Sequence, residues 1–172
     1  PMTYGGLGFN VLPDLRARIP GHFLGDRVDL AVQTVEALMK APRAAQSVET
    51  VSREYLELRD LFVESRSLIE AESSRLLNGE QIAPRHVSMA NLEMGRNIEA
   101  ALTLGDIRFV GADLEWVEGL LVHHHVPADS LEHYLEAYHQ ALRTELGERG
   151  KVISDWLGGL IGSDGSEEKE KN

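Results

Sequence analysis

Residues 85–106 read RHVSMANLEMGRNIEAALTLGD, and this stretch decides the fold of the chain. Pro84 stands directly before it, and proline is favoured in the first turn of a helix. A helix from Pro84 would end at Gly105, because glycine readily takes the left-handed conformation that terminates helices. Asp106 can then cap a further helix that begins at Ile107. The stretch therefore predicts two consecutive helices that meet at a sharp corner.

The segment before this stretch predicts the longest helix of the chain. Its apolar residues recur at spacings of three and four, with one turn skipped at Ser65, which places on one face Val48, Val51, Tyr55, Leu58, Phe62 and Ile69. Ser47 is a plausible cap for its start, and the Asn78-Gly79 pair a usual stop for its end. We therefore expect one amphipathic helix that runs from about residue 48 to Leu77.

Three other segments repeat apolar residues at helical spacing: 27–40, the segment from Pro127 to Leu146, and 152–161. In the first of them the apolar stripe consists of Val28, Ala31, Val32, Val35, Leu38 and Met39. We find no convincing strand pattern and no internal repeat. The fold class is therefore all-α, with six to eight helices joined by short loops.

The domain organisation follows from the same pattern. We expect a flexible, glycine-rich N-terminal arm over residues 1–13 and a single helical domain over residues 14–161. The acidic, polar residues 162–172 are expected to be a disordered tail. At 172 residues the chain is long enough for one domain with a substantial core.

Composition excludes several classes of function. The net charge is −11, and no basic patch is present, so we expect no binding to nucleic acid. The absence of cysteine excludes disulfides, thiolate nucleophiles and thioether-linked cofactors. We find no apolar run that could span a membrane and no signal pattern, so we expect a cytoplasmic protein without membrane contact. We find no nucleophile with a base and an acid at useful spacing, and we expect no enzymatic activity.

The sequence resembles two related families over roughly residues 85–146. The run NIEAALTLGD, residues 97–106, resembles the phycocyanin family, in which the chromophore-bearing helix ends at a similar Gly-Asp break. The run EWVEGLLVHHHVPADSLEHYLEAYHQAL, residues 115–142, looks more like the photoglobins. These are non-haem globin-like domains, proposed to be photosensors, that accompany cobalamin-binding sensor domains. The resemblance implies a globin-like helical sandwich.

The resemblance also implies a ligand pocket between the long helix, the central helix and the Ile107 helix, and a linear tetrapyrrole (bilin) as its ligand. The family's bilin-bearing cysteine falls on Val87, and the aspartate that holds the pyrrole nitrogens falls on Ala90. Any bilin would therefore be bound noncovalently. We expect the residues that bind it to be Arg85, His86, Glu93, Arg96, Tyr55 and Tyr134.

The chemistry of these side chains explains why they are expected at the ligand site. Arg85 and Arg96 could pair with propionates, because guanidinium groups suit carboxylates. Glu93 is the carboxylate nearest to the missing aspartate. Tyr55 and Tyr134 could pack on a flat ligand and reach a polar group with their hydroxyls, although core packing alone would also explain them.

The histidines leave an alternative open. His86 lies close to where a haem globin has its proximal ligand, so it could ligate haem iron, although a partly exposed histidine in the first helical turn would look the same. His123, His124 and His125 stand at a predicted helix end, where positive charge is favourable, and point in different directions around the helix. They predict a capping role rather than a metal site.

We therefore expect a non-enzymatic, globin-like sensor or ligand-binding module. A haem-binding globin that uses His86 is one alternative, and a purely structural helical interaction module is another. A homodimer is expected, because phycocyanin relatives pair through their N-terminal helices and apolar residues lie near both ends of the chain: Phe9, Leu12, Trp156 and Leu160. A separate cobalamin-binding or other signalling protein is a further possible partner.

Overall fold

A computed structural model describes residues 2–6, 8–44, 47–80, 82–113 and 129–167 of the chain. Its contacts divide the chain into two compact units, Pro1–Val51 and Ser52–Asn172. The sequence predicts a different organisation, with an arm over residues 1–13 and one domain over residues 14–161.

The first unit contains two very short strands among its helices. Their order is β1 (Thr3–Tyr4), α1 (Gly8–Val11), the 3₁₀ helix η1 (Pro13–Ala17), β2 (His22–Phe23) and α2 (Val28–Lys40). The strands are parallel, with Thr3 opposite His22 and Tyr4 opposite Phe23. The expectation of no strand is wrong here, because a two-residue strand is too short to show an alternating pattern.

A small aromatic cluster holds the first unit together. The ring of Phe9 lies 4.8 Å from that of Tyr4 and 6.3 Å from that of Phe23, centre to centre. The guanidinium of Arg16 covers the Phe23 ring at 4.0 Å and donates a hydrogen bond from Nε to the Phe9 carbonyl at 2.9 Å. Residues 2–6 and 8–13 therefore take part in a packed unit.

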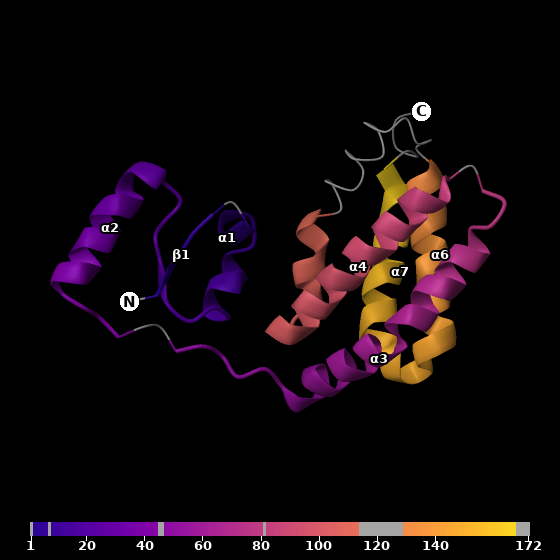
Figure 1. Cartoon of the computed structure of the whole chain (residues 1–172), viewed down its shortest axis with the longest axis horizontal. Coiled ribbons are helices and arrows are strands. Elements are labelled where there is room, and N and C mark those ends of the chain that lie inside the picture. The colour runs from indigo at the N-terminus through magenta and orange to yellow at the C-terminus, as the bar shows by residue number, and fades with distance from the viewer. Residues whose placement is uncertain (1, 7, 45–46, 81, 114–128, 168–172) are drawn as a thin grey trace. The chain divides into compact units, whose positions relative to one another are not determined.

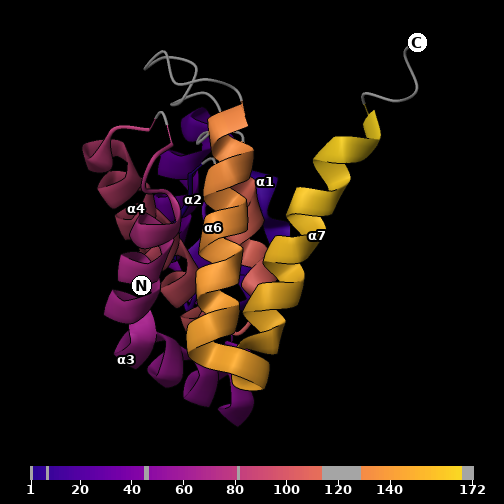
Figure 2. The same ribbon diagram turned by 90° about the vertical axis from the view of Figure 1, so that its right-hand side faces the viewer.

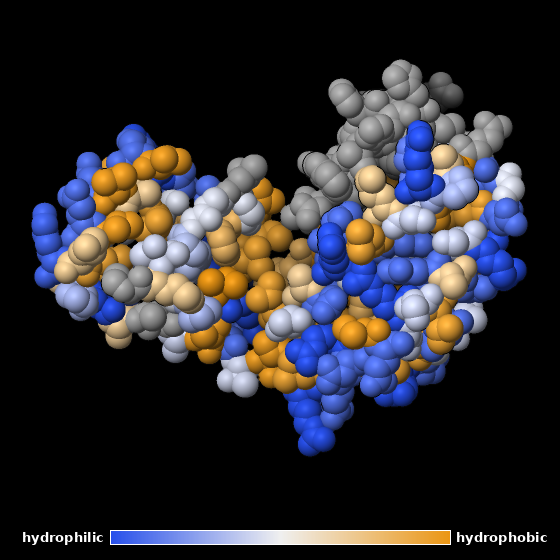
Figure 3. All heavy atoms as spheres, viewed as in Figure 1, coloured by the Kyte–Doolittle hydropathy of each residue, from blue (hydrophilic) through white to orange (hydrophobic). Residues whose placement is uncertain are grey.

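Helix α2 leaves half of its predicted apolar stripe exposed. Val28 is 87%, Val32 63% and Met39 71% exposed, whereas Leu38 is buried; apolar residues are visible along this helix in Figure 3. The sequence pattern predicts a buried face, and for Val28, Val32 and Met39 that prediction is wrong. Helical periodicity shows which residues share a face, but it does not show whether another element covers that face.

The second unit is a bundle of helices: α3 (Arg53–Leu76), α4 (Pro84–Leu104), the 3₁₀ helix η2 (Ile107–Asp113), α6 (Asp129–Leu146), η3 (Gly147–Gly150) and α7 (Lys151–Glu167). Helix α3 packs against α4 and α6, and α6 packs against α7 (Figure 1). The predicted predominance of helices is confirmed. None of the helices in the described part of the chain is long and apolar enough to cross a membrane.

Helix α3 begins at a different serine from the one expected. Ser52 is its cap, and the Ser52 hydroxyl oxygen accepts a hydrogen bond from the backbone N–H of Tyr55 at 3.4 Å. The prediction of Ser47 is wrong because the segment between them is held in the first unit. There the Glu49 N–H donates to the Ala17 carbonyl at 3.2 Å, and the Glu49 carboxylate pairs with Arg18 at 3.2 Å.

Removing the α3 cap gives a first test. Ser52→Ala should lower the free energy of unfolding of the second unit by about 1 kcal/mol, because it leaves a backbone donor of the first turn without its partner. Urea unfolding followed by circular dichroism measures the change. Ser47→Ala is the matched control and should change stability by less than about 0.5 kcal/mol; equal losses in the two variants would contradict the assignment.

The corner predicted at Gly105 is confirmed. Helix α4 begins at Pro84 and ends at Leu104, and the residue that caps its end, Gly105, has a φ of 78°. The Asp106 N–H donates to the Ala101 carbonyl and the Gly105 N–H to the Leu102 carbonyl, both at 3.1 Å, as in a Schellman ending. The Asp106 carboxylate then accepts the Arg108 N–H at 3.0 Å, which starts η2.

The core of the second unit consists of side chains from all its helices. Those that are fully buried include Phe62, Ile69, Ile98, Leu102, Tyr138, Leu142, Ile153 and Leu157. Trp156 and Leu160 pack against this core from α7, so these two apolar residues are used within the unit. Helix α7 continues to Glu167, beyond the predicted end at residue 161. The predicted helix start at Pro127 and the run His123–His125 lie outside the described residues.

Candidate functional site

A group of polar side chains lies within the bundle, around Glu70 of α3. We call it the polar centre, and it consists of Arg66, Glu70, Ser73, Asn91, Tyr134 and Tyr138. The α3 members recur at spacings of four and three, which places them on one helical face. Tyr134 and Tyr138 are one turn apart on α6, and their ring centres are 5.9 Å apart. Asn91 comes from α4, so three helices contribute.

Arg66 ties α3 to α4. Its Nε donates to the Glu70 carboxylate at 2.7 Å and its Nη2 to the Leu92 carbonyl at 2.9 Å, while Nη1 lies 3.6 Å from the Glu99 carboxylate. Gly95 makes this possible, because a Cβ at that position would lie only 2.5 Å from Arg66 Nε. The glycine inside α4 therefore leaves room for the guanidinium.

Asn91 makes a second connection between the same helices. It is only 2% exposed, and its side chain hydrogen-bonds to three groups of α3. Its Nδ2 donates to the Glu70 carbonyl and to the Ser74 hydroxyl, each at 3.2 Å, and its Oδ1 accepts from the Ser73 hydroxyl at 3.4 Å. A buried amide satisfied in this way fixes the register of the two helices.

The two tyrosines differ from these satisfied groups. Tyr134 is 5% exposed and Tyr138 is 0% exposed, and neither buried hydroxyl has a hydrogen-bond partner among the described residues. Burial raises the pKa of Tyr134 well above its ordinary value, and electrostatic interactions with the neighbouring Tyr138 and with Glu70 raise it further. Burial also raises the pKa of Tyr138, with a further rise from Glu70 and an opposing effect from Arg66. Both hydroxyls therefore stay neutral in the folded protein at neutral pH.

The residues predicted from sequence are not all brought together. Arg85 and His86 are neighbours in the first turn of α4, where Arg85 Nε donates to His86 Nε2 at 3.2 Å. Glu93 and Arg96 form an ion pair at 3.1 Å further along the same helix. Arg85 and Arg96 are exposed, whereas His86 and Glu93 are half-buried.

The two predicted tyrosines lie far apart. Glu70 is near enough to Tyr134 to affect its pKa, whereas Tyr55 is fifteen positions before Glu70 on α3, about 22 Å along the helix at 1.5 Å per residue. Tyr55 is half-buried near the start of α3. Of the six predicted site residues, only Tyr134 belongs to the polar centre.

Sequence reasoning missed the other members of the polar centre. Arg66 shares α3 with the exposed Arg53, and the sequence alone does not distinguish the two, but the Arg66 side chain is only 20% exposed against 90% for Arg53. Gly95 is the one sequence feature that points to this contact. Glycine inside a helix lowers its stability relative to alanine, so a glycine there often leaves room for a neighbouring side chain.

The described histidines form no metal site. His133 pairs with Glu80 at 3.4 Å, and His139 lies 2.9 Å from the Ser154 hydroxyl. Among the described residues, no three histidine, aspartate or glutamate side chains gather closely enough to hold a metal ion.

We compared the chain with models of protein families, with curated proteins and with solved structures, and none of the three comparisons gives a match.

Proposed function

We propose that the second unit is a non-enzymatic, globin-like ligand-binding and sensor module of the photoglobin type. The observation that supports this best is the pair of buried, unpartnered hydroxyls of Tyr134 and Tyr138. Roughly nine in ten buried polar groups in proteins have a hydrogen-bond partner. Two neighbouring tyrosine hydroxyls without a partner, within electrostatic reach of the Glu70 carboxylate, favour a binding site in which a bound molecule supplies the missing hydrogen bonds.

The proposed ligand is a linear tetrapyrrole bound noncovalently, as the resemblance implies. Without cysteine, affinity would come from burial of the flat apolar ligand, at about 25 cal/mol per Å², and from hydrogen bonds. The tyrosine hydroxyls can donate to carbonyl groups or accept from pyrrole N–H groups. Glu70 is the carboxylate beside them, and it could take the role of the aspartate that Ala90 replaces in the resemblance.

Entry of such a ligand would require the helices to separate, because the side chains around the tyrosines are fully buried. Phe62, Ile69 and Tyr138 are all 0% exposed. A ligand that binds only the opened arrangement shifts the bundle toward it, by as much as its affinities for the two arrangements differ. This coupling between binding and helix packing is what a sensor needs in order to signal to a partner.

Spectral titration tests the proposal. Biliverdin added to the full chain should give a saturable shift in absorbance, and Tyr134→Phe should weaken it by several-fold through the loss of a buried hydrogen bond, worth about 1 kcal/mol. Tyr55→Phe is the matched control and should leave the titration unchanged, because Tyr55 lies outside the polar centre. No saturable change with biliverdin would contradict the tetrapyrrole proposal.

The same titration with haem tests the alternative that uses His86. Haem bound through this residue would give a strong Soret band that His86→Ala abolishes. In the structure His86 Nε2 accepts a hydrogen bond from Arg85, so iron binding through that nitrogen would first have to displace Arg85.

A purely structural interaction module is the second candidate, and the completely buried core side chains favour it. Under this proposal the polar centre only fixes helix register, and the chain acts by docking a signalling partner or by forming a homodimer. Phe9 packs inside the first unit, so the exposed apolar residues of α2 offer the better surface for such contact.

A further inference from the structure

A groove lined by residues of α6, η3 and α7 lies apart from the polar centre. Helices α6 and α7 meet at η3 and diverge from there (Figure 2). Two neighbouring hollows of about 760 and 580 Å³ share His139, Arg143 and Gly158, so they form one continuous groove.

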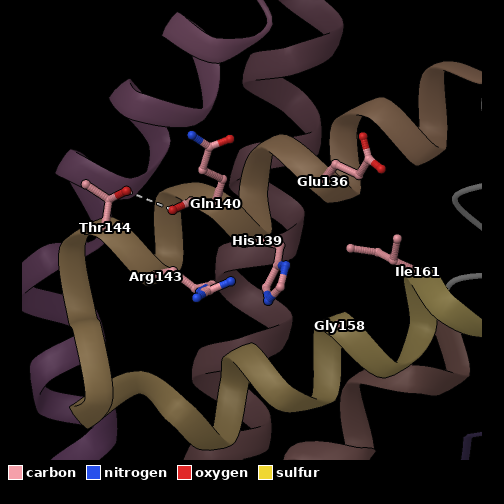
Figure 4. Close-up of a pocket in the computed structure, with 7 residues that line it drawn as sticks. All are labelled: Glu136, His139, Gln140, Arg143, Thr144, Gly158 and Ile161. Atoms are coloured by element: carbon pink, nitrogen blue, oxygen red, sulfur yellow. Dashed lines mark hydrogen bonds between the residues drawn. The ribbon is translucent and has the colours of Figure 1, made fainter.

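Arg143 provides an available positive charge in this groove. Its side chain is exposed, and within the described part of the chain no hydrogen bond or ion pair engages its guanidinium. His139 is one turn earlier on α6, and both side chains extend from α6 toward α7 (Figure 4). The other basic residue of the groove, Lys151, is already paired with Asp155 at 3.0 Å.

A second donor lies opposite. The Ser154 hydroxyl of α7 is 2.9 Å from His139 Nε2. When His139 Nε2 carries the proton, it donates to the Ser154 oxygen, and the serine O–H is then free to donate to a ligand. An unpaired guanidinium together with a hydroxyl donor suits a carboxylate.

The rest of the lining limits the charge and the shape of the ligand. Glu136, Glu148 and Asp155 also line the groove, so a doubly charged phosphate would be repelled more than a monoanion. Gly158 adds no side chain to the floor, and a Cβ there would only touch the His139 ring, at 3.4 Å, so a larger side chain is needed to fill the groove. Ile161 gives an apolar end on the far side of Gly158 from Ser154.

We propose that this groove binds a small organic monocarboxylate, with the carboxylate on Arg143 and Ser154 and the apolar part along Ile161. The site is independent of the proposed tetrapyrrole site. Its ligand is defined by one negative charge and a short apolar chain.

Hexanoate is the probe, and backbone amide shifts of the isotope-labelled full chain are the measurement. Hexanoate should give saturable shifts in residues 139–144 and 151–161, while hexanamide and inorganic phosphate should bind at least roughly tenfold more weakly, because charge-assisted hydrogen bonds are the stronger ones. No saturable shift with hexanoate, or equal binding of hexanamide, would overturn the proposal.

Two matched pairs of variants locate the site. Arg143→Gln should weaken hexanoate binding by about tenfold or more, whereas Arg149→Gln removes the same charge from an exposed position outside the groove and should leave it nearly unchanged. Gly158→Leu should block binding by filling the floor, whereas Gly159→Leu should not, because a Cβ at Gly159 meets nothing within 4 Å. Equal effects within either pair would overturn the assignment to this groove.

Discussion

Phe62→Ala should lower the free energy of unfolding of the second unit by about 3–5 kcal/mol. Phe62 is 0% exposed on α3, in the core between α3, α4 and α6. Removal of its ring loses the transfer free energy of the side chain and leaves a cavity that the surrounding helices can close only in part. Since small domains have a total stability of roughly 5–15 kcal/mol, the variant would be close to unfolding.

Urea unfolding followed by circular dichroism measures this loss, and the next residue supplies the control. Val63 is 46% exposed on the same helix, so Val63→Ala should cost less than about 1 kcal/mol. A similar loss for the two variants would mean that the face of α3 that contains Phe62 is not the buried one.

The same spacing of apolar residues was a reliable guide to α3 and a poor one to α2. Leu58, Phe62 and Ile69 are buried as the pattern predicts, because α3 has α4 and α6 to pack against. Val28 and Val32 follow an equally regular pattern on α2 and are exposed. Periodicity is a property of one helix, whereas burial depends on a second element, which local sequence does not reveal.

The polar centre shows the corresponding difference for the site. Tyr134 could be proposed from sequence because its type and spacing suit a pocket. Its burial in the core within electrostatic reach of Glu70 could not be proposed, because contacts between helices separated by tens of residues depend on how the bundle closes. The predicted cluster on α4 came from the family resemblance instead, and in the structure its members form only local pairs, Arg85 with His86 and Glu93 with Arg96.

The two buried tyrosines should make the second unit sensitive to alkaline pH. An unfolded tyrosine ionises with a pKa of about 10, whereas burial holds the pKa values of Tyr134 and Tyr138 higher in the folded protein. Below about pH 10 the folded and the unfolded protein both keep the two phenolic protons, so the free energy of unfolding keeps its full value. Above it only the unfolded state releases them, so stability falls as pH rises, by about 1.4 kcal/mol per pH unit for each tyrosine and about 2.7 kcal/mol for both.

Urea unfolding between about pH 9 and pH 11 measures this slope, and phenylalanine variants assign it. Tyr134→Phe or Tyr138→Phe should each remove about half of the tyrosine contribution, and the double variant should remove all of it. The background from other titrating groups is common to all four proteins and cancels in the comparison. At pH 7 the single variants should be at least as stable as the parent, because each loses a hydroxyl that has no partner in the described structure. If the parent and the double variant lost stability equally above pH 10, both hydroxyls would have to be open to solvent, and the buried polar centre would be disproved together with the ligand site proposed for it.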